Sequence, residues 1–333
     1  MVLAPMADVT DPAFRRIIAK YGKPDVMWTE FVSADGLFRG GGGGYQGLVK
    51  DLAYSEAERP IVAQFFTGIP EMMRKAAALA VELGFDGVDI NMGCPDKGIV
   101  KSGAGAHLLR HPKLAQEIVL AAKEGAGALP VSVKTRIGWS RDELETLLPV
   151  LLETDPAVIT IHARTRDEMS AVPARWEHVK RAVEIRNQSG RETLIFGNGD
   201  VASIQDAVEK ATLSGCDGVM LGRAIFGNPW LFADSRRNLL NTTEIWPTPE
   251  VKLPEEILPE EKLKVLLEHT CLYGEILPHK AFAIMKKHFK AYVSGWDGAK
   301  ELRMKLMAAN NAREFAAILE NSVATTTATG GAQ

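Results

Sequence analysis

The sequence predicts an α/β protein built on a (β/α)8 barrel, followed by a small all-α helical domain. Two observations favour the barrel: eight short apolar, β-branched segments occur within residues 1–230, and amphipathic helical patterns separate most of them. Eight such repeats in this length are typical of a TIM barrel of parallel strands. A doubly wound open sheet is the alternative, but the phosphate-binding glycine motif expected after its first strand is absent from residues 4–14.

The predicted strands span, in chain order, residues 2–6, 26–32, 61–66, 87–92, 131–137, 158–164, 194–199 and 218–222. Helical periodicity fills most of the gaps, at 12–22, 70–84, 112–125, 142–153, 176–186 and 203–215. The segment between the second and third strands departs from this pattern, because it lacks a clear helix and contains five consecutive glycines, Gly40 to Gly44. We interpret it as a flexible loop.

The character of the chain changes after Pro229. Residues 241–260 carry four prolines and are typical of a linker, whereas residues 261–321 show helical periodicity throughout. Residues 322–333 have the low apolar content of a disordered tail. We therefore expect a catalytic barrel domain at 1–240, a linker at 241–260, a helical domain at 261–321 and a tail at 322–333.

The bulk composition is that of an ordinary globular protein. Hydrophobic residues make up 46% of the 333 positions, and the formal net charge of −3 gives no general attraction to nucleic acid. The three cysteines, Cys94, Cys216 and Cys271, are too widely spaced for a CxxC metal pair or a disulfide framework, which fits a reducing cytoplasm. With no long apolar run and no leader at the N-terminus, we expect a cytoplasmic monomer without metal or membrane attachment.

Cys94 follows directly after the predicted fourth strand. The glycines that come next, Gly98, Gly103 and Gly105, suggest a mobile loop before the following helix. A thiol presented on such a loop is placed for chemistry. A buried cysteine packed as a small apolar side chain explains the local sequence equally well.

Functional side chains gather at the carboxyl ends of the predicted strands, which form the active-site face of a barrel. Each one alone could be a satisfied core residue, but accidental placements would scatter over both ends of the barrel. The residues at these ends are Pro5, Met6, Gln64, Asn91, Cys94, Lys134, Arg136, His162, Arg164, Asn198, Asp200 and Arg223.

Glycines after the seventh and eighth strands indicate a phosphate site. Gly199 and Gly222 lie where barrels commonly bind phosphate through backbone N–H groups, and Arg223 adds a cation. A lysine, a glutamine and an asparagine around a planar ring, next to such a site, describe a pocket for flavin mononucleotide (FMN). A sugar phosphate would fit the phosphate site equally well.

Nine segments of the chain carry a family resemblance: APMADVTDPAFR, TEFVSADGL, DINMGCPDKGIVKSGAGAHLL, VSVKTRIGW, ITIHARTR, GNGDV, GVMLGRAIFGNPWLF, MKKHFKAYVSGW and ELRMKLM. In this order they resemble the tRNA-dihydrouridine synthases. The resemblance implies a flavin-dependent oxidoreductase that uses FMN and NADPH to reduce the C5–C6 double bond of specific uridines in tRNA. The chain departs from the usual family pattern in the glycine run and in EMSAVPARW after the sixth strand.

The resemblance also implies roles by position. Cys94 would donate the proton to C5 of the uracil after hydride from reduced FMN reaches C6, and an ordinary thiol, with a pKa of about 8.5, is protonated at neutral pH. The residues that would hold FMN are Pro5, Met6, Ala7, Gln64, Lys134, His162, Asn198, Gly199, Asp200, Gly222 and Arg223. Those expected at the uridine are Asn91, Arg164 and Arg166, and those expected at the RNA are Lys286, Lys287, Lys290 and Arg303.

Residues 279–313 form a basic stretch, with eight positive side chains against two acidic ones. With Phe289, Tyr292 and Trp296 interleaved, this is either a face that contacts phosphates and stacks on bases, or a solvated helix surface above core aromatics. Two other functions stay open. An FMN-dependent reductase of a free pyrimidine, similar to dihydroorotate dehydrogenase, gives no reason for this basic stretch, and an RNA-binding protein with an inactive barrel gives none for Cys94.

Overall fold

The computed structural model describes residues 1–39, 42–233 and 257–329. The chain divides into two compact units: unit 1 comprises Met1–Asp11 and Pro24–Ala224, and unit 2 comprises Pro12–Lys23 and Ile225–Gln333. Most of the predicted linker, residues 241–256, lies outside the described residues. None of the helices in the described part is both long and apolar enough to cross a membrane.

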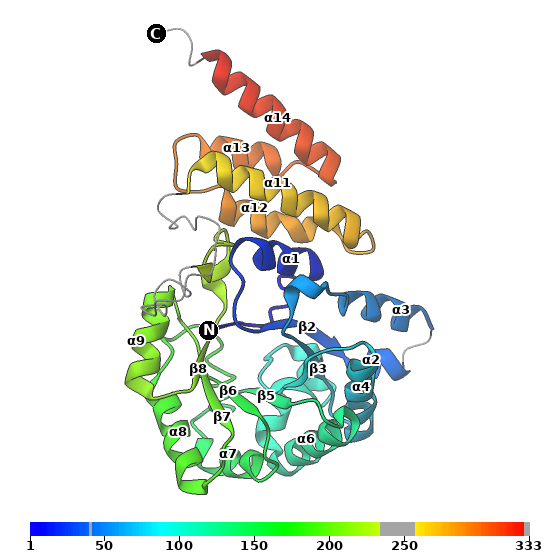
Figure 1. Cartoon of the computed structure of the whole chain (residues 1–333), viewed down its shortest axis with the longest axis vertical. Coiled ribbons are helices and arrows are strands. Elements are labelled where there is room, and N and C mark those ends of the chain that lie inside the picture. Colours follow the sequence, from blue (N-terminus) through cyan, green and yellow to red (C-terminus); the bar gives the residue numbers. More distant parts are fainter. Residues whose placement is uncertain (40–41, 234–256, 330–333) are drawn as a thin grey trace. The chain divides into compact units, whose positions relative to one another are not determined.

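Unit 1 is a barrel of eight parallel strands surrounded by helices, so the predicted fold class is confirmed (Figure 1). Hydrogen bonds join neighbouring strands in chain order from β2 to β8, and β8 pairs with β1. A parallel bridge between Val2 and Val26, next to β2, closes the ring. The strands are β1 (Val2–Leu3), β2 (Met27–Ser33), β3 (Ile61–Phe66), β4 (Gly87–Asn91), β5 (Val131–Arg136), β6 (Val158–His162), β7 (Leu194–Asn198) and β8 (Gly218–Leu221).

The outer helices begin and end where the sequence places its helix signals. They are α4 (Pro70–Glu82), α6 (Pro112–Ala126), α7 (Leu144–Leu152), α8 (Glu177–Ser189) and α9 (Ile204–Ser214). Proline occupies the first turn of α4 and α6, where its missing N–H costs nothing. Gly190 and Gly215 end α8 and α9 in the left-handed conformation. Covered by these helices, β4 is buried at all five positions, as expected for a parallel strand.

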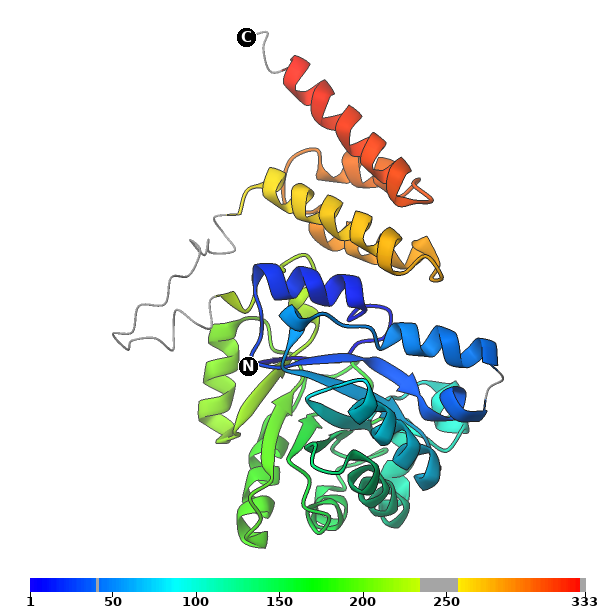
Figure 2. The ribbon, with the colours of Figure 1, turned by 45° about the vertical axis from the view of Figure 1, so that its right-hand side comes forward.

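The prediction of a flexible loop between β2 and β3 is wrong for the residues that the structure describes. Two helices occupy this segment, α2 (Ala34–Arg39) and α3 (Gly42–Asp51), followed by the short helix η1 (Glu56–Glu58) (Figures 1 and 2). The Leu48 side chain of α3 lies so close to Gly36 of α2 that a Cβ at Gly36 would come within 2.6 Å of it. Packing between the two helices therefore outweighs the weak helix propensity of glycine.

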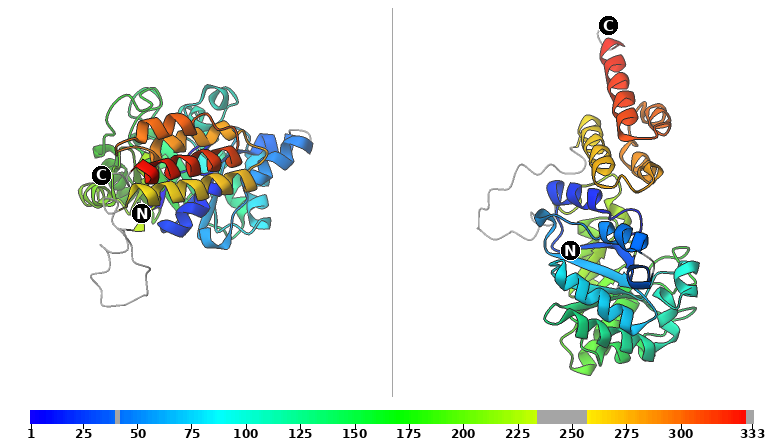
Figure 3. Two further views of the ribbon diagram at one scale, coloured as in Figure 1. Left: turned by 90° about the horizontal axis from the view of Figure 1, so that it is seen from above. Right: turned by 90° about the vertical axis from the view of Figure 1, so that its right-hand side faces the viewer.

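Unit 2 is all helical, as the sequence predicts for its C-terminal part. It contains α1 (Pro12–Tyr21), α11 (Pro259–Ile276), η5 (Phe282–Met285), α12 (Lys286–Tyr292), α13 (Ala299–Leu306) and α14 (Ala312–Thr329). Figure 3 shows α14 running alongside α11. The predicted tail differs from the structure, because α14 continues through it to Thr329, while residues 330–333 lie outside the described part.

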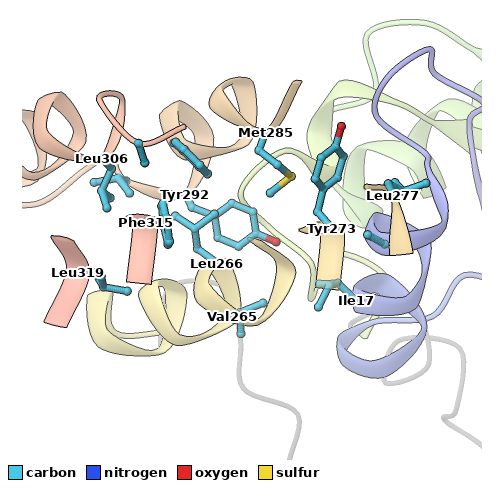
Figure 4. Close-up of a cluster of buried hydrophobic side chains, with 14 of the residues drawn as sticks. Ile17, Val265, Leu266, Tyr273, Leu277, Met285, Tyr292, Leu306, Phe315 and Leu319 are labelled. Carbon is cyan, nitrogen blue, oxygen red and sulfur yellow. The ribbon is translucent and has the colours of Figure 1, made fainter. Parts of the chain in front are cut away.

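The core of unit 2 explains why its boundary differs from the predicted barrel domain at 1–240. Helix α1 contributes Ala13 and Ile17 to the same buried cluster as Leu266 and Tyr273 of α11 (Figure 4). The amphipathic pattern of residues 12–21 was correctly identified as a helix. Its apolar face belongs to unit 2, however, because its partner α11 comes more than two hundred residues later in the sequence.

Candidate active site

A cavity of about 750 Å³ lies in unit 1, lined by residues that follow the carboxyl ends of the strands. A volume of this size suits a ligand as large as a nucleotide. Thirteen residues that the sequence singles out line it: Pro5, Met6, Asn91, Cys94, Lys134, Arg136, His162, Arg164, Asn198, Gly199, Asp200, Gly222 and Arg223. The structure therefore brings together residues from β1 and from β4 to β8 of the barrel.

Three of the expected site residues are not part of the cavity wall. Gln64 is fully buried on β3. The guanidinium of Arg166 lies over the Trp139 ring, 4.6 Å from its centroid, and pairs with Asp167 at 2.8 Å. Ala7 is exposed in the turn that follows Met6.

The segment after Cys94 is ordered, and its description as a mobile loop is wrong. Asp96 caps the short helix α5 (Lys97–Lys101) by accepting hydrogen bonds from the backbone N–H groups of Gly98 at 2.8 Å and Ile99 at 3.1 Å. The short helix η2 (Gly105–Arg110) follows. Gly105 has φ of 58°, and a Cβ there would approach the Cys94 carbonyl oxygen to 2.9 Å. The glycines of this segment thus allow tight turns and a close approach, not mobility.

The Cys94 thiol is half-buried at the edge of the cavity. Burial raises its pKa above the usual range of a thiol, and the nearby cations Arg136 and Lys134 only partly oppose this effect. At neutral pH the side chain is therefore a thiol. It has a proton to donate.

Lys134 reaches the cavity from β5, and its position is fixed by an amide. Its Nζ donates to Oδ1 of Asn198 at 3.1 Å, and Nδ2 of Asn198 donates to the Met220 carbonyl oxygen at 2.8 Å. Burial lowers the pKa of Lys134 to about 8, while the carboxylate of Asp89 opposes the shift. The amine is therefore still charged at neutral pH.

Burial and the neighbouring positive charges keep His162 neutral. Nη1 of Arg164 lies 3.2 Å from Nε2 of His162, so this nitrogen acts as an acceptor. Burial, followed by the positive charges of Lys134, Arg136, Arg164 and Arg223, lowers the pKa of His162 well below its usual value. The imidazole therefore carries no charge at neutral pH.

Asp200 joins two arginines behind this histidine. Its Oδ2 accepts from Nη2 of Arg164 and from the Ala174 backbone N–H, and its Oδ1 accepts from Nη2 of Arg223 at 2.7 Å. These hydrogen bonds hold the pKa of Asp200 below its usual range. The preceding residue, Gly199, has φ of 121°, which a side chain would strain.

Gly222 leaves open space in the cavity wall. A Cβ built there would meet nothing closer than 3.7 Å, from Ala4 and Met6, so the packing of the chain itself does not require glycine at this position. Its value is the room that it leaves for a ligand. Four cationic residues line the cavity, Lys134, Arg136, Arg164 and Arg223, whereas Asp200 is the one acidic residue in its lining. The site therefore suits an anionic ligand.

The structure gives Arg136 a structural role and adds one residue, Asp89, to the expected set. Arg136, identified only as a strand-end residue, donates from Nε to the Gly93 carbonyl oxygen at 2.8 Å and from Nη1 to the carbonyl oxygens of Thr165 and Met169. Asp89 is buried on β4, outside the cavity wall, and was missed. Its position two residues before Asn91 on β4 is a signal that could have found it, since alternate strand residues share a face.

The residues expected at the RNA lie in unit 2. On α12, Lys286 and Lys287 are partly exposed and Lys290 is exposed. Nη1 of Arg303 on α13 donates to the Val293 carbonyl oxygen at 3.0 Å. Phe289 and Tyr292 are buried in the core of unit 2, so the idea that they stack on bases is wrong.

A family model and the curated relatives point to one family. The family model for "Dihydrouridine synthase (Dus)" matches residues 2–329. The chain is 38% identical to a probable tRNA-dihydrouridine synthase 2 of Bacillus subtilis (strain 168), over 96% of this chain and 93% of that protein. It is 37% identical to a probable tRNA-dihydrouridine synthase of Staphylococcus aureus (strain COL), over 96% and 92%. Among solved structures, morphinone reductase in complex with tetrahydroNAD aligns with a TM-score of 0.50 at 16% identity, over 75% of this chain and 89% of that one, which shows a shared fold alone.

Proposed function

Because this chain belongs to the dihydrouridine synthase family of oxidoreductases, we propose that it reduces the C5–C6 double bond of specific uridines in tRNA to 5,6-dihydrouridine, with FMN as its cofactor and NADPH as its reductant. The observation that carries the proposal is the position of a protonated thiol, Cys94, on the wall of a cationic cavity large enough for a nucleotide. This arrangement combines a proton donor with an anion-binding site.

The residues present fit FMN. Its phosphate would lie near Arg223, where Gly222 leaves open space and Gly199 forms a tight turn. Its ring system would lie against Lys134 and Asn198, with Pro5 and Met6 completing the wall. When bound, FMN would supply the hydride that reaches C6 of the uracil.

The protein's own contribution is a proton and a fixed set of charges. The proton on Sγ of Cys94 goes to C5 of the uracil, where the reduction leaves negative charge. Lys134, held by Asn198 and still charged at neutral pH, stabilises negative charge in the cavity. His162 is neutral and accepts from Arg164, so it offers a hydrogen-bonding group without adding to the positive charge.

The expected partner is tRNA. A uridine must leave its stack to enter the cavity, which costs a few kcal/mol, so the enzyme needs further contacts with the RNA. The three lysines of α12, two partly exposed and one exposed, are candidates for phosphate contacts. With Asn91 and Arg164 in the cavity wall, we expect these two side chains near the uracil.

One experiment tests the function and separates it from reduction of a free pyrimidine. The purified full chain, supplied with FMN and NADPH, is incubated with unmodified tRNA or with free uridine, and dihydrouridine is measured by mass spectrometry. We expect product in tRNA only. FMN-loaded protein that forms no dihydrouridine in any tRNA offered would overturn the proposal, and equal turnover of free uridine would favour the smaller substrate.

A further inference from the structure

A continuous chain of side-chain hydrogen bonds connects the buried carboxylate of Asp89 to the backbone of Cys94. Nε2 of Gln64 donates to Oδ2 of Asp89 at 2.5 Å, and Nδ2 of Asn91 donates to Oε1 of Gln64 at 3.1 Å. Oδ1 of Asn91 then accepts from the backbone N–H groups of Gly93 at 3.1 Å and Cys94 at 2.9 Å. Every donor in this chain of hydrogen bonds points towards Asp89.

Both ends of the chain have fixed polarity. The N–H groups of Gly93 and Cys94 can only donate, and an ionised carboxylate such as Asp89 can only accept. The two amides between them, Gln64 and Asn91, could each be turned by half a rotation, but either rotation would set donor against donor or acceptor against acceptor. The carboxylate therefore selects the same orientation of both amides that the two N–H groups require, and it holds the chain of hydrogen bonds from its far end.

Burial makes a wrong orientation costly. Gln64 is 0% exposed and Asp89 is 1% exposed, so water does not replace a lost partner at either group. Asp89 is further held by a hydrogen bond from Oγ of Ser132 on β5. Its charge also faces that of Lys134, which favours the ionised form.

We propose that Asp89 is a positioning residue for Cys94: its carboxylate orients the amides of Gln64 and Asn91, and Asn91 thereby holds the backbone that presents the thiol to the cavity. Gln64, expected from the family resemblance to hold FMN, is on this view first of all a link in that chain. The importance of Cys94 rests on the proposed function, but the hydrogen-bond chain does not.

The test measures the thiol without the reaction. The full-length protein is treated with iodoacetamide, with and without added FMN, and alkylation of the Cys94 peptide is followed by mass spectrometry. Asp89→Ala removes the last acceptor, so the turn at Cys94 loosens and the half-buried thiol becomes more accessible. We expect the Cys94 alkylation rate to rise about tenfold, the factor that corresponds to the loss of one hydrogen bond. Gln64→Leu removes the next link in the series of hydrogen bonds and should give the same rise in the alkylation rate. The double variant should add little to that rise.

Two matched variants separate orientation from charge and from general loosening. Asp89→Asn loses the charge but keeps an oxygen for Gln64, with its NH2 group turned to Ser132, so its alkylation rate should stay within about twofold of wild type. Ser132→Ala removes a buried hydrogen bond to the same carboxylate that does not belong to the series leading to Cys94. The alkylation rate of this variant should also change little.

The outcomes are separable. An unchanged rate in both Asp89→Ala and Gln64→Leu overturns the proposal, as does an Asp89→Asn rate raised as far as that of Asp89→Ala. If Asp89→Ala does not fold, Gln64→Leu alone decides. Should the wild-type protein form no dihydrouridine, the proposed function fails while the alkylation rates still test the positioning role. Where it does, Asp89→Ala should lower kcat for tRNA by about tenfold to a hundredfold and change KM little.

Discussion

Acid should destabilise unit 2 through His269, and replacing His269 with leucine should remove much of that effect. His269 is 0% exposed, and both of its ring nitrogens lack a hydrogen-bond partner among the described residues. The rings around it belong to His288 at 4.7 Å, Phe14 at 5.5 Å and Tyr292 at 6.4 Å. Burial without a partner lowers the pKa of His269 from 6.5 to about 3.

The sign and size of the effect follow from this pKa. The unfolded chain binds a proton on this histidine below pH 6.5, whereas the folded unit resists it down to about pH 3. Stability is therefore fully present above pH 6.5 and falls by about 1.4 kcal/mol for each pH unit below it. At pH 5 the loss through His269 amounts to about 2 kcal/mol, and near pH 3 to about 5 kcal/mol. Burial also lowers the pKa of His288, which adds a loss of the same sign.

Native-state hydrogen exchange of α11 and α12, measured by mass spectrometry, reports the free energy of unfolding of this unit separately from that of the barrel. His269→Leu should be at least as stable as wild type at pH 7.5, because leucine needs no hydrogen-bond partner. At pH 5 its advantage should grow by about 2 kcal/mol. Groups away from His269 titrate alike in both proteins and cancel in the comparison. The positive charge of a protonated His269 lowers the pKa of His288, so its loss in His269→Leu makes the acid effect of His288 smaller and adds to the advantage of the variant. An equal loss of stability between pH 7.5 and pH 5 in both proteins would refute the reasoning.

Three further predictions concern the site and its loop. Cys94→Ala should keep the FMN absorbance but lower dihydrouridine formation by about a hundredfold or more; undiminished product, measured by mass spectrometry, would remove this thiol from the mechanism. Replacing the three lysines of α12 with glutamate should weaken tRNA binding and flatten its salt dependence in a titration. Unchanged binding would show that these lysines do not contact the RNA. Gly105→Ala should lower the free energy of unfolding by about 1 to 3 kcal/mol more than Gly127→Ala. Both glycines have φ of 58°, but only a Cβ at Gly105 would meet a backbone atom, at 2.9 Å. Equal losses of stability in urea unfolding would contradict this account.

Local patterns in the sequence predict most of the barrel. All eight strands were placed correctly, because a parallel strand covered on both faces must be apolar along its length. The placement of Lys134, His162 and Asn198 at strand ends likewise predicts that they share a cavity. These are short-range signals, and they predict correctly wherever a residue type at a given position has a single structural explanation.

Long-range packing could not be predicted in the same way. The sequence near α1 does not indicate that the apolar face of this helix packs against α11. The sequence around the glycine run likewise does not predict that Leu48 packs on Gly36. The basic stretch shows the same limit, since Phe289 and Tyr292 have a spacing that suits either a core or a stacking surface. Only the complete set of neighbours decides between the two.

Asp89 and Lys134 of unit 1 keep their charges although both are buried, whereas the buried His269 of unit 2 does not. In unit 1, burial raises the pKa of Asp89 to about 6 and lowers that of Lys134 to about 8, but each charge supports the other. Between these two values the carboxylate stays an acceptor for Gln64 and the amine stays a cation facing the cavity. Among the described residues of unit 2, His269 has no such partner, so it stays neutral and contributes to the core by packing. Opposite charges thus keep Asp89 and Lys134 ionised at the candidate site, whereas protonation of His269 by acid destabilises the core of unit 2.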